Sequence, residues 1–488
     1  MICVAIRGPT YQEAQAQIAA AMPYADLVEL RLDLFQEIDF AEILKLRGFC
    51  QIPCLFTLRD RTQGGTYPCS EESRLKDLHR LAELEPDYLD IESHVPRDFV
   101  EELSKRYPKV KVILSYHDFS MTPEDLNAIH NKMRKVPAYF YKIAVMAHNT
   151  LDMLRVLICV KESDGRLIGI SMGEDGIPSR IIGPVVGCPL TYACLDETQK
   201  TAPGQISAKD LEKVYHYHAL NPQTTLYGLI GDPVETSISQ WTHNALFRSL
   251  GWNAVYVKMR VRAEELEEFF KLIKRLPFRG LSVTMPHKER VMQYVDEVDG
   301  IAQQIGAINT LLLEGGKIKG TNTDGIGALN AIEKQRKVNG KKVVLLGSGG
   351  AAKAIAYEAA QRDAHLIILN RHGESAEELA KHFGAIGGGL ELMEQYHEQG
   401  YDILINSTPS AMPIEPIHLD HKALVMDIKT KPKDNPLLIA ARERGYPVVY
   451  GYEMFIEQAL GQFALWFPNE FDHTKARSIL ENESLRVL

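Results

Sequence analysis

The chain has few cysteines, and none of them lies beyond residue 194. An odd number of thiols at irregular spacing, with no CxxC pair, is not the pattern of a disulfide framework or of a zinc site. We therefore expect reduced, mostly buried thiols and no bound metal. The seven positions are Cys3, Cys50, Cys54, Cys69, Cys159, Cys188 and Cys194.

Long apolar runs and blocks of basic residues are also missing. No run approaches the ~18 residues that a membrane span requires. The net charge is −9, and no cluster of lysine and arginine suggests a nucleic-acid surface. The first residues, "MICVAIRG", are strand-like, so we expect no leader peptide. The sequence predicts a cytoplasmic protein that acts on small molecules.

Short β-type runs alternate with helical stretches over the first 220 of the 488 residues. About eight such units favour a (β/α)8 TIM barrel over an open doubly wound sheet, because polar residues recur at the carboxyl ends of the strands. The runs are "ICVAI", "DLVELRLD", "PCLFTLRD", "DYLDIES", "KVILSYHD", "FYKIAVM", "RLIGISMG" and "PLTYACL". We expect a last helix from "SAKDLEKVYHYHAL", with Ser207 and Asp210 in a capping pattern.

The remainder predicts an α/β protein of two subdomains after a short linker, "NPQTT". We place the barrel at 1–220 and a first subdomain at 224–325. A Rossmann subdomain follows at 326–451. The C-terminal helices, 452–488, are expected to pack back on the first subdomain and complete it.

Lys142 lies in the middle of an apolar strand, "FYKIAV". Lysine is almost never fully buried unless it is paired. Burial and neighbouring cations would both lower its pKa, and moving that pKa to between 7 and 8 changes its protonation free energy by about 4 kcal/mol. A neutral amine can form a Schiff base with a ketone, and a histidine in reach, such as His117, is the natural base.

Other polar residues fall at strand ends or in the last loop of the predicted barrel. Arginines there would hold a carboxylate bidentately. Singly, each residue has a structural alternative: Glu29 and Arg31 could form an ion pair in the barrel wall, and His117 could be a core histidine. Together they favour one site at the barrel mouth. The set is Glu29, Arg31, Arg59, His117, Lys142, Arg180, Thr201 and Gln205.

The motifs "ADLVELRLD", "SYHDF", "YKIAVMA" and "APGQI" resemble type I 3-dehydroquinate dehydratase over nearly all of 1–220. The resemblance implies that Lys142 forms the Schiff base, that His117 is the general acid/base and that Arg180 binds the substrate carboxylate. Glu29, Arg31, Arg59, Thr201 and Gln205 would bind the other substrate oxygens. The family usually has a carboxylate where this chain has Gln63, a change that bears on proton transfer at His117.

The second half contains a lysine, "VTMPHKE", and an aspartate, "NTDGIG". Pro286 is acceptable near a helix start, so Lys288 is expected in the first turn of a helix, a poor place for a merely structural cation. Asp324 is expected in a turn before a helix, where an N-cap or an Asx turn is its structural alternative.

The run "VVLLGSGGAAKA" is the dinucleotide-binding fingerprint in its usual context, a strand that leads into a helix. Gly347 allows the tight turn, Gly349 lets backbone N–H groups approach a pyrophosphate, and Ala352 allows close helix packing. The next strand ends in Asn370 and Arg371 instead of an acidic residue. An arginine there suits the 2′-phosphate of NADP.

The motifs "GDPVETSIS", "VTMPHK", "GAINT", "NTDG", "GSGGAA", "INSTP" and "EMFIEQA" resemble shikimate dehydrogenase over 224–488. The resemblance implies that Lys288 and Asp324 are the catalytic pair. It places shikimate on Ser237, Ser239, Thr284, Asn309 and Gln458. The cofactor would lie near Gly347, Gly349, Gly350, Ala351, Asn370, Arg371, Asn406 and Thr408. Two positions depart from the family pattern: Ser375 stands where a second arginine is frequent, and Thr430 where a tyrosine is common.

The order of the two halves resembles the fused dehydratase/dehydrogenase family of plants and some bacteria. It implies that 3-dehydroshikimate made in the barrel is reduced with NADPH in the second half, in aromatic biosynthesis. Three alternatives remain open: an aldolase-like barrel, a quinate dehydrogenase, and an inactive barrel that serves as a scaffold.

Overall fold

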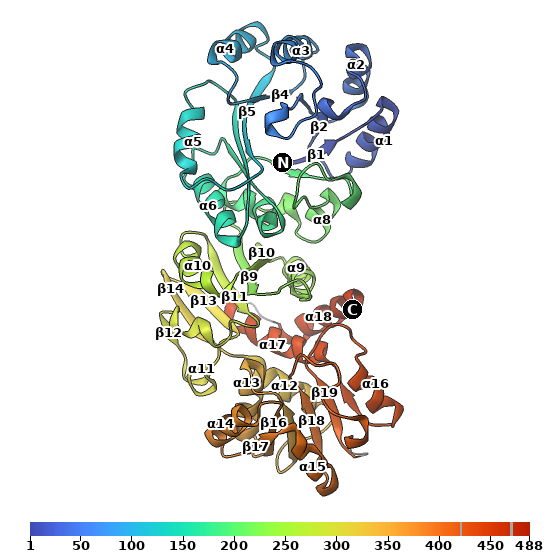
Figure 1. The fold of residues 1–488 in the computed structure, drawn as a ribbon, viewed down its shortest axis with the longest axis vertical. Coiled ribbons are helices and arrows are strands. Elements are labelled where there is room, and N and C mark those ends of the chain that lie inside the picture. Colours follow the sequence, from blue (N-terminus) through green and yellow to red (C-terminus); the bar gives the residue numbers. More distant parts are fainter. Residues whose placement is uncertain (420–421, 469–471) are drawn as a thin grey trace. The chain divides into compact units, whose positions relative to one another are not determined.

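The computed structural model describes residues 1–419, 422–468 and 472–488. The chain separates into two compact units (Figure 1). The first consists of Met1–Leu226, Asn253–Arg260 and Lys271–Pro277, and the second of Tyr227–Trp252, Val261–Phe270 and Phe278–Leu488. Within the described ranges, no helix has the length and apolar character to cross a membrane.

The N-terminal region is an eight-stranded parallel barrel, in the order β7-β6-β5-β4-β3-β2-β1-β8. Consecutive strands are neighbours, and β1 lies between β2 and β8, which excludes the open doubly wound sheet. All eight predicted strands are present. They are β1 (Ile2–Ile6), β2 (Leu27–Arg31), β3 (Cys54–Thr57), β4 (Tyr88–Glu92), β5 (Lys111–Asp118), β6 (Phe140–Met146), β7 (Leu167–Met172) and β8 (Thr191–Ala193).

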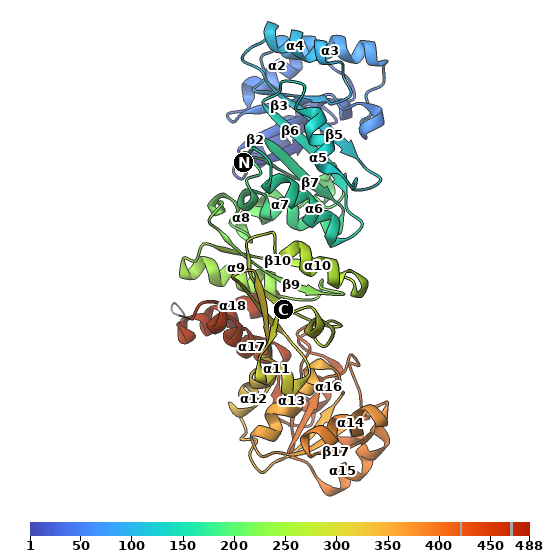
Figure 2. The same cartoon turned by 90° about the vertical axis from the view of Figure 1, so that its left-hand side faces the viewer.

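Helices cover the outside of the barrel (Figure 2). Several begin at a side chain that caps backbone N–H groups: Thr10 forms a capping box, and Ser70 and Asn149 accept from the third residue of their helices. The helices are α1 (Tyr11–Ala21), α2 (Phe40–Phe49), α3 (Glu71–Glu83), α4 (Arg97–Arg106), α5 (Leu126–Met133), α6 (Thr150–Lys161), α7 (Ile177–Ile182) and α8 (Ala208–Lys213).

Helix α8 is shorter than the sequence predicts. Its N-terminus is as expected, because the Ser207 hydroxyl accepts from the Asp210 amide at 3.0 Å. The helix ends at Lys213, and His216 follows with a φ of 51°. A left-handed residue cannot continue a right-handed helix, which explains the early end.

The first subdomain of the second half contains a six-stranded mixed sheet, in the order β10-β9-β11-β13-β14-β12. Its strands β13 and β14 form an antiparallel hairpin. The strands are β9 (Thr225–Gly231), β10 (Ala254–Arg260), β11 (Phe278–Val283), β12 (Glu297–Val298), β13 (Thr310–Glu314) and β14 (Lys317–Thr321). The helices are α9 (Ser239–Leu250), α10 (Leu266–Ile273) and α11 (Gly300–Ile305).

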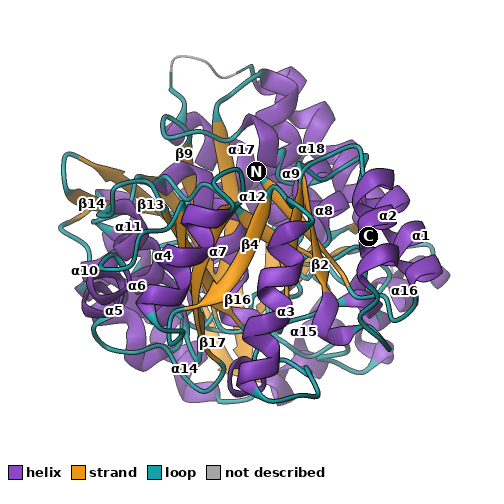
Figure 3. Cartoon of the chain, turned by 90° about the horizontal axis from the view of Figure 1, so that it is seen from above, coloured by secondary structure: helices purple, strands orange, loops and turns teal. Residues whose placement is uncertain are grey.

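The second subdomain contains a parallel sheet in the Rossmann order, β17-β16-β15-β18-β19-β20, with helices over the strands (Figure 3). The strands are β15 (Lys342–Leu346), β16 (His365–Asn370), β17 (Ile386–Gly389), β18 (Ile403–Asn406), β19 (Leu424–Asp427) and β20 (Val448–Val449). The helices are α12 (Asp324–Glu333), α13 (Gly350–Gln361), α14 (Gly373–Phe383), α15 (Met393–Gln399) and α16 (Pro436–Glu443).

Two C-terminal helices, α17 (Gly451–Trp466) and α18 (His473–Val487), return toward the first subdomain of the second half. Helix α17 packs against α12 and against β11 and β13, and α18 packs against α9. The fit is close at Gly280 in β11, where a Cβ atom would lie 2.3 Å from the Trp466 indole nitrogen. Helix α17 thereby brings Gln458 to the sheet edge that carries Asn309.

Candidate active sites

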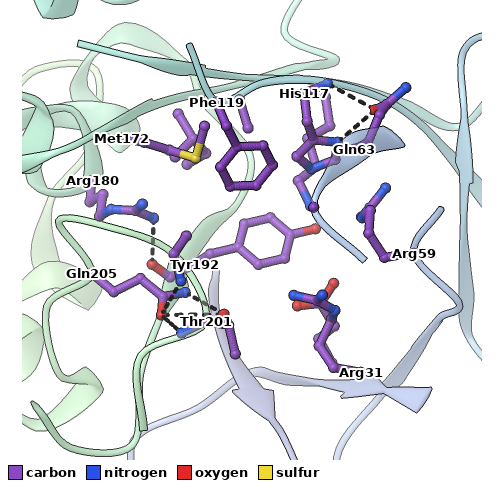
Figure 4. Close-up of a pocket in the computed structure, with 16 residues that line it drawn as sticks. Arg31, Arg59, Gln63, His117, Phe119, Met172, Arg180, Tyr192, Thr201 and Gln205 are labelled. Atoms are coloured by element: carbon purple, nitrogen blue, oxygen red, sulfur yellow. Dashed lines mark hydrogen bonds between the residues drawn. The ribbon is translucent and has the colours of Figure 1, made fainter. Parts of the chain in front are cut away.

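One pocket opens at the carboxyl ends of the barrel strands (Figure 4). All eight residues that the sequence assigns to the barrel site line it. They come from β2, the loop after β3, β5, β6, α7 and the loop after β8. Gln63, Phe119, Met172 and Tyr192 also line the pocket. The predicted convergence of these residues is therefore what the structure shows.

Lys142 lies in the middle of β6, opposite Ser115 on β5 and Ile168 on β7. It is 5% exposed. Its Nζ lies 3.4 Å from Oδ2 of Asp90 and 3.9 Å above the centre of the Tyr192 ring. The buried amine thus has a carboxylate and an aromatic face as neighbours. Lys142 also lines the pocket.

The Asp90 carboxylate also pairs with a second cation, Arg59. Arg59 donates through Nη1 to Asp90 at 2.9 Å and to Glu92 at 3.0 Å. Ser115 donates to the same Asp90 oxygen at 2.6 Å. The sequence analysis missed Asp90 and Glu92. Their signal was the alternation in "DYLDIES", which places two carboxylates on the inner face of the strand next but one to that of Lys142.

Burial lowers the pKa of Lys142, Asp90 and Glu29 oppose this effect, and Arg59 reinforces it. The direction agrees with the expectation, but the predicted cationic surroundings are only part of the cause. The nearest charge is the anion of Asp90. Burial alone would raise the pKa of Asp90, yet Arg59 and Lys142 hold it well below its usual range.

His117 is oriented by Gln63. The Gln63 Oε1 atom lies 3.1 Å from His117 Nδ1 and accepts the His117 backbone N–H at 3.0 Å. Burial, followed by the charges of Arg59 and Lys142, places the pKa of His117 well below its ordinary value. The imidazole is therefore neutral near pH 7 and can accept a proton.

Arg180 is buried, and backbone carbonyls hold its guanidinium. Nε donates to Gly204 at 3.0 Å and Nη1 to Tyr192 at 3.0 Å. Burial without a carboxylate partner lowers its pKa to about 10. An arginine that faces a pocket with no carboxylate of its own is suited to an anionic ligand.

The other barrel residues are held by local partners. Thr57 donates to Glu29 at 2.7 Å, and Gln205 accepts from the Thr201 amide at 2.7 Å. Arg31 makes a bidentate pair with Asp33, at 2.9 Å for each bond. The guanidinium fork of Arg31 is thus occupied by a residue that the sequence analysis did not single out.

In the second half, Lys288 and Asp324 meet directly, with Nζ 2.5 Å from Oδ2. Asn309 donates to the other oxygen of Asp324 at 2.9 Å and to Gln458 Oε1 at 3.3 Å. Four of the predicted residues, from four separate segments of the chain, therefore form one cluster.

Two local expectations about this cluster were wrong. Lys288 does not begin a helix: its carbonyl accepts from Ile308 N at 2.7 Å, a long-range bond, and a short 3₁₀ turn starts only at Arg290. Asp324 is the first residue of α12 and not a residue before it, since Thr323 occupies the N-cap position.

The remaining predicted substrate residues lie on the first subdomain of the second half. Ser237 and Ser239 are 2.9 Å apart through their hydroxyls at the start of α9. Thr284 follows β11, and its amide donates to Ile230 at 2.9 Å. A Cβ atom at Gly231 would lie 2.3 Å from the Thr284 methyl group, so these two strand ends are tightly packed.

The glycine loop fits a dinucleotide. Gly347 has a φ of 114°, and a Cβ atom there would lie 2.5 Å from the Ser407 hydroxyl. At Gly349, the N-cap of α13, a Cβ atom would meet open space, and no side chain caps the helix. A helix N-terminus with open space before it is suited to a pyrophosphate. A Cβ atom at Gly350 would lie 3.0 Å from Cβ of Lys288, so the start of α13 adjoins the cluster of Lys288 and Asp324. Ala351 follows in the first turn of α13.

The other predicted cofactor residues differ in orientation. Arg371 is exposed at the end of β16, and Asn370 donates to the Ser348 hydroxyl at 2.7 Å. Asn406 is fully buried and bonds to Asp427 at 2.7 Å and to Thr408 at 2.8 Å. Asn406 thus holds the loop that contains Thr408 through its side-chain oxygen.

Known protein families match both halves. Residues 2–222 match type I 3-dehydroquinase, 229–311 match the shikimate dehydrogenase substrate binding domain, and 330–440 match shikimate / quinate 5-dehydrogenase. The shikimate biosynthesis protein AroDE of Chlamydia pneumoniae is 39% identical over 470 residues, 96% of each chain. The chloroplastic bifunctional 3-dehydroquinate dehydratase/shikimate dehydrogenase of Arabidopsis thaliana is 38% identical, over 91% of this chain and 77% of its own.

Among solved structures, a shikimate dehydrogenase in complex with NADP⁺ matches with a TM-score of 0.51 and 37% identity. It covers 54% of this chain and 97% of its own. The chain therefore belongs to the family of bifunctional shikimate-pathway enzymes in which a type I 3-dehydroquinate dehydratase is joined to a shikimate dehydrogenase.

Proposed function

We propose that Lys142 is the residue on which the barrel dehydrates 3-dehydroquinate. The neutral Nζ attacks the ring ketone, water leaves, and an iminium forms that withdraws electrons from the adjacent carbon. His117 Nε2 takes the proton from that carbon, and the same proton assists departure of the hydroxyl group as water. Hydrolysis of the iminium returns the amine and 3-dehydroshikimate, so the net change is the loss of one water.

Arg180 binds the substrate carboxylate, because its buried guanidinium lacks a carboxylate partner. Glu29, Arg31, Thr201 and Gln205 surround the pocket and bind hydroxyl groups of the ring. Arg59 acts indirectly. Its positive charge offsets the charge of Asp90, so that this carboxylate cannot hold Lys142 as a tightly paired ammonium.

The second half reduces 3-dehydroshikimate to shikimate with NADP as its cofactor. NADPH supplies the hydride when bound. Lys288 passes a proton to the ketone oxygen, and Asp324, held by Asn309, positions that lysine. Ser237, Ser239, Thr284, Asn309 and Gln458 bind the substrate. Gly347, Gly349, Gly350 and Ala351 receive the pyrophosphate, Asn370 and Arg371 the adenosine phosphate, and Asn406 and Thr408 shape the adjoining loop.

The domain limits that we propose are 1–220 for the dehydratase, 224–325 with 452–488 for substrate binding, and 326–451 for the cofactor. A cytoplasmic location stays a prediction from the sequence, which cell fractionation would test.

The observation that carries the proposal is the placement of Lys142, buried and loosely paired, in one pocket with the neutral His117. A coupled assay from 3-dehydroquinate to shikimate tests it. Lys142→Ala should abolish formation of 3-dehydroshikimate and leave the reduction of added 3-dehydroshikimate intact. Lys288→Ala should do the reverse and accumulate 3-dehydroshikimate. Loss of both steps in either variant, or loss of neither, would contradict the assignment.

A further inference from the structure

A line of hydrogen bonds leads from the protein surface to the base in the barrel pocket. Gln63 Nε2 lies 3.1 Å from His94 Nδ1, and His94 Nε2 lies 3.4 Å from Asp60 Oδ2. At the other end, Gln63 Oε1 meets His117 Nδ1 at 3.1 Å (Figure 4). Gln63 and His117 line the pocket, whereas His94 lies outside it with a side chain that is 42% exposed.

One backbone amide fixes the direction of every bond in this line. The His117 backbone N–H can only donate, so the Gln63 atom 3.0 Å away must be the oxygen. The same oxygen then accepts from His117 Nδ1–H, which leaves the lone pair of His117 on Nε2. The Gln63 amino group points toward His94 Nδ1, which must accept, and His94 therefore carries its proton on Nε2.

We infer that His94 is a positioning residue for the dehydratase reaction and makes that reaction sensitive to pH. The inference rests on the proposed role of His117 as the base. In its neutral form His94 accepts from Gln63 and holds the amide in the orientation that sets the His117 tautomer. A neutral glutamine, linked in this way, does what a carboxylate does elsewhere in the family.

A second proton on His94 reverses the contact with Gln63. Nδ1–H and the Gln63 amino group are both donors, so they repel each other. If Gln63 turned its amide over, its amino group would face the backbone N–H and Nδ1–H of His117. In either case His117 loses the acceptor that fixes its tautomer, and the dehydration rate falls.

The other charged groups around His94 act on its Nε2 side. Asp60 and Glu71 approach Nε2 at 3.4 and 3.8 Å. Arg74 on α3 pairs with Glu71 at 2.7 Å and with Glu92 at 2.6 Å, and Glu92 accepts from the Asp60 amide at 3.0 Å. Asp60 and Glu71 thus face Nε2, which carries its hydrogen in both protonation states of His94. A second proton on His94 therefore changes only the contact at Nδ1, where the Gln63 amino group is a donor.

Two variants test separately whether His94 must accept a hydrogen bond from Gln63 and whether a second proton on His94 causes the loss of rate. His94→Asn places a carbonyl oxygen near the position of Nδ1, which accepts at every pH, and His94→Leu provides no acceptor. Both are measured as kcat and KM of the dehydratase between about pH 5 and pH 8, where histidine changes its charge. Shikimate oxidation with NADP⁺ on the same preparations serves as the control for folding.

His94→Leu should lower kcat at neutral pH about tenfold, part of the ~10²–10⁴-fold that general acid–base catalysis contributes, with KM unchanged because His94 lies outside the pocket. His94→Asn should keep the neutral kcat and lose less rate on the acid side than the wild-type chain.

Wild-type kcat and pH profiles in both variants would overturn the role of His94. So would an equal loss of rate in acid for His94→Asn and the wild-type chain. Borohydride reduction with 3-dehydroquinate separates this failure from that of the proposed function. An adduct on Lys142 in all three proteins with unchanged profiles removes only the role of His94, and no adduct in the wild-type chain contradicts both.

Discussion

Both halves of the chain pair a lysine with an aspartate, but the two pairs differ in distance and in how the carboxylate is shared. Lys142 is 3.4 Å from an Asp90 carboxylate that Arg59 and Ser115 also contact. Lys288 is 2.5 Å from Asp324. The second contact is a short charge-assisted hydrogen bond, whereas the first is long, at 3.4 Å, to a carboxylate that has other donors.

The comparison shows that a neighbouring carboxylate does not by itself hold the pKa of a buried lysine at its ordinary value. Asp90 is largely neutralised by Arg59, so the cost of burial decides the outcome and lowers the pKa of Lys142. The same two residue types therefore support the two roles that we propose, a nucleophile in the barrel and a proton-transfer pair in the dehydrogenase. The following predictions test this contrast in order of expected effect.

Replacing Asp324, the carboxylate that contacts Lys288, should have the largest kinetic effect. Asp324→Asn leaves Lys288 without its charged partner, and shikimate oxidation should fall by about 10²–10⁴-fold, the range of general acid–base catalysis. Dehydratase activity in the same protein should remain, which makes it the internal control. A dehydrogenase rate close to that of the wild-type chain would show that the 2.5 Å contact is not used in turnover.

Replacing Asp90, the carboxylate that Lys142 and Arg59 share, should mainly lower the free energy of unfolding. Asp90→Asn deprives buried Arg59 of a charged partner, and breaking such a pair costs about 3–5 kcal/mol. Urea unfolding of the barrel should report this loss. Asp98→Asn, an exposed carboxylate on α4, is the matched control and should unfold like the wild-type chain.

The same Asp90→Asn variant sharpens the electrostatic side of the comparison. Asp90 raises the pKa of Lys142 against the effect of burial. Its removal should therefore shift the titration of Lys142 to lower pH. A shift to higher pH would mean that Asp90 does not favour the ammonium form.

Replacing Arg371 should affect only the dehydrogenase activity, and there only the KM for NADP⁺. An arginine that bonds a 2′-phosphate contributes about 1.5–3 kcal/mol. Arg371→Ala should therefore raise KM for NADP⁺ by about ten- to a hundredfold and leave KM for NAD⁺ unchanged. An equal change for both cofactors would place the arginine elsewhere on the nucleotide.

The smallest expected effect is at the opposite end of the barrel. Burial alone would lower the pKa of His218, but Glu212 at 2.7 Å and Asp26 at 3.0 Å raise it. A raised pKa in the folded state stabilises the barrel at low pH, and this contribution is lost as pH rises through that pKa. Because the side chain is 42% exposed, the contribution is at most about 1 kcal/mol.

His218→Gln removes this charge and should lower the thermal midpoint at pH 5.5 more than at pH 8.5. Equal changes at both pH values would remove the electrostatic explanation.

The sequence predicted the strands of the barrel and the glycine loop because each has a local pattern. Period-2 alternation and strand-end polarity placed Lys142 and His117 in one site, and the strand-to-helix context identified Gly347. What it missed depends on contacts between strands. Nothing local in "DYLDIES" shows that Asp90 faces Lys142, since that requires the order of strands β4, β5 and β6 in the closed barrel.

The wrong expectation for Lys288 has the same origin. Pro286 suggested a helix start, but the carbonyl of Lys288 is taken by Ile308 from a distant segment. The hydrogen bond from the Asn406 amide to Asp427 on the adjacent strand is likewise invisible in the local motif. Long-range hydrogen bonds thus fix details that the local pattern leaves open.

The most direct test of the account is a titration of the Lys142 amine. Competitive labelling with a trace acylating reagent over a range of pH, followed by mass spectrometry of the peptide that contains Lys142, gives its pKa without turnover. The account predicts a midpoint below the ordinary lysine value of 10.5. A midpoint at or above that value would show that the Asp90 contact outweighs burial, and would contradict the role of Lys142 as a neutral nucleophile.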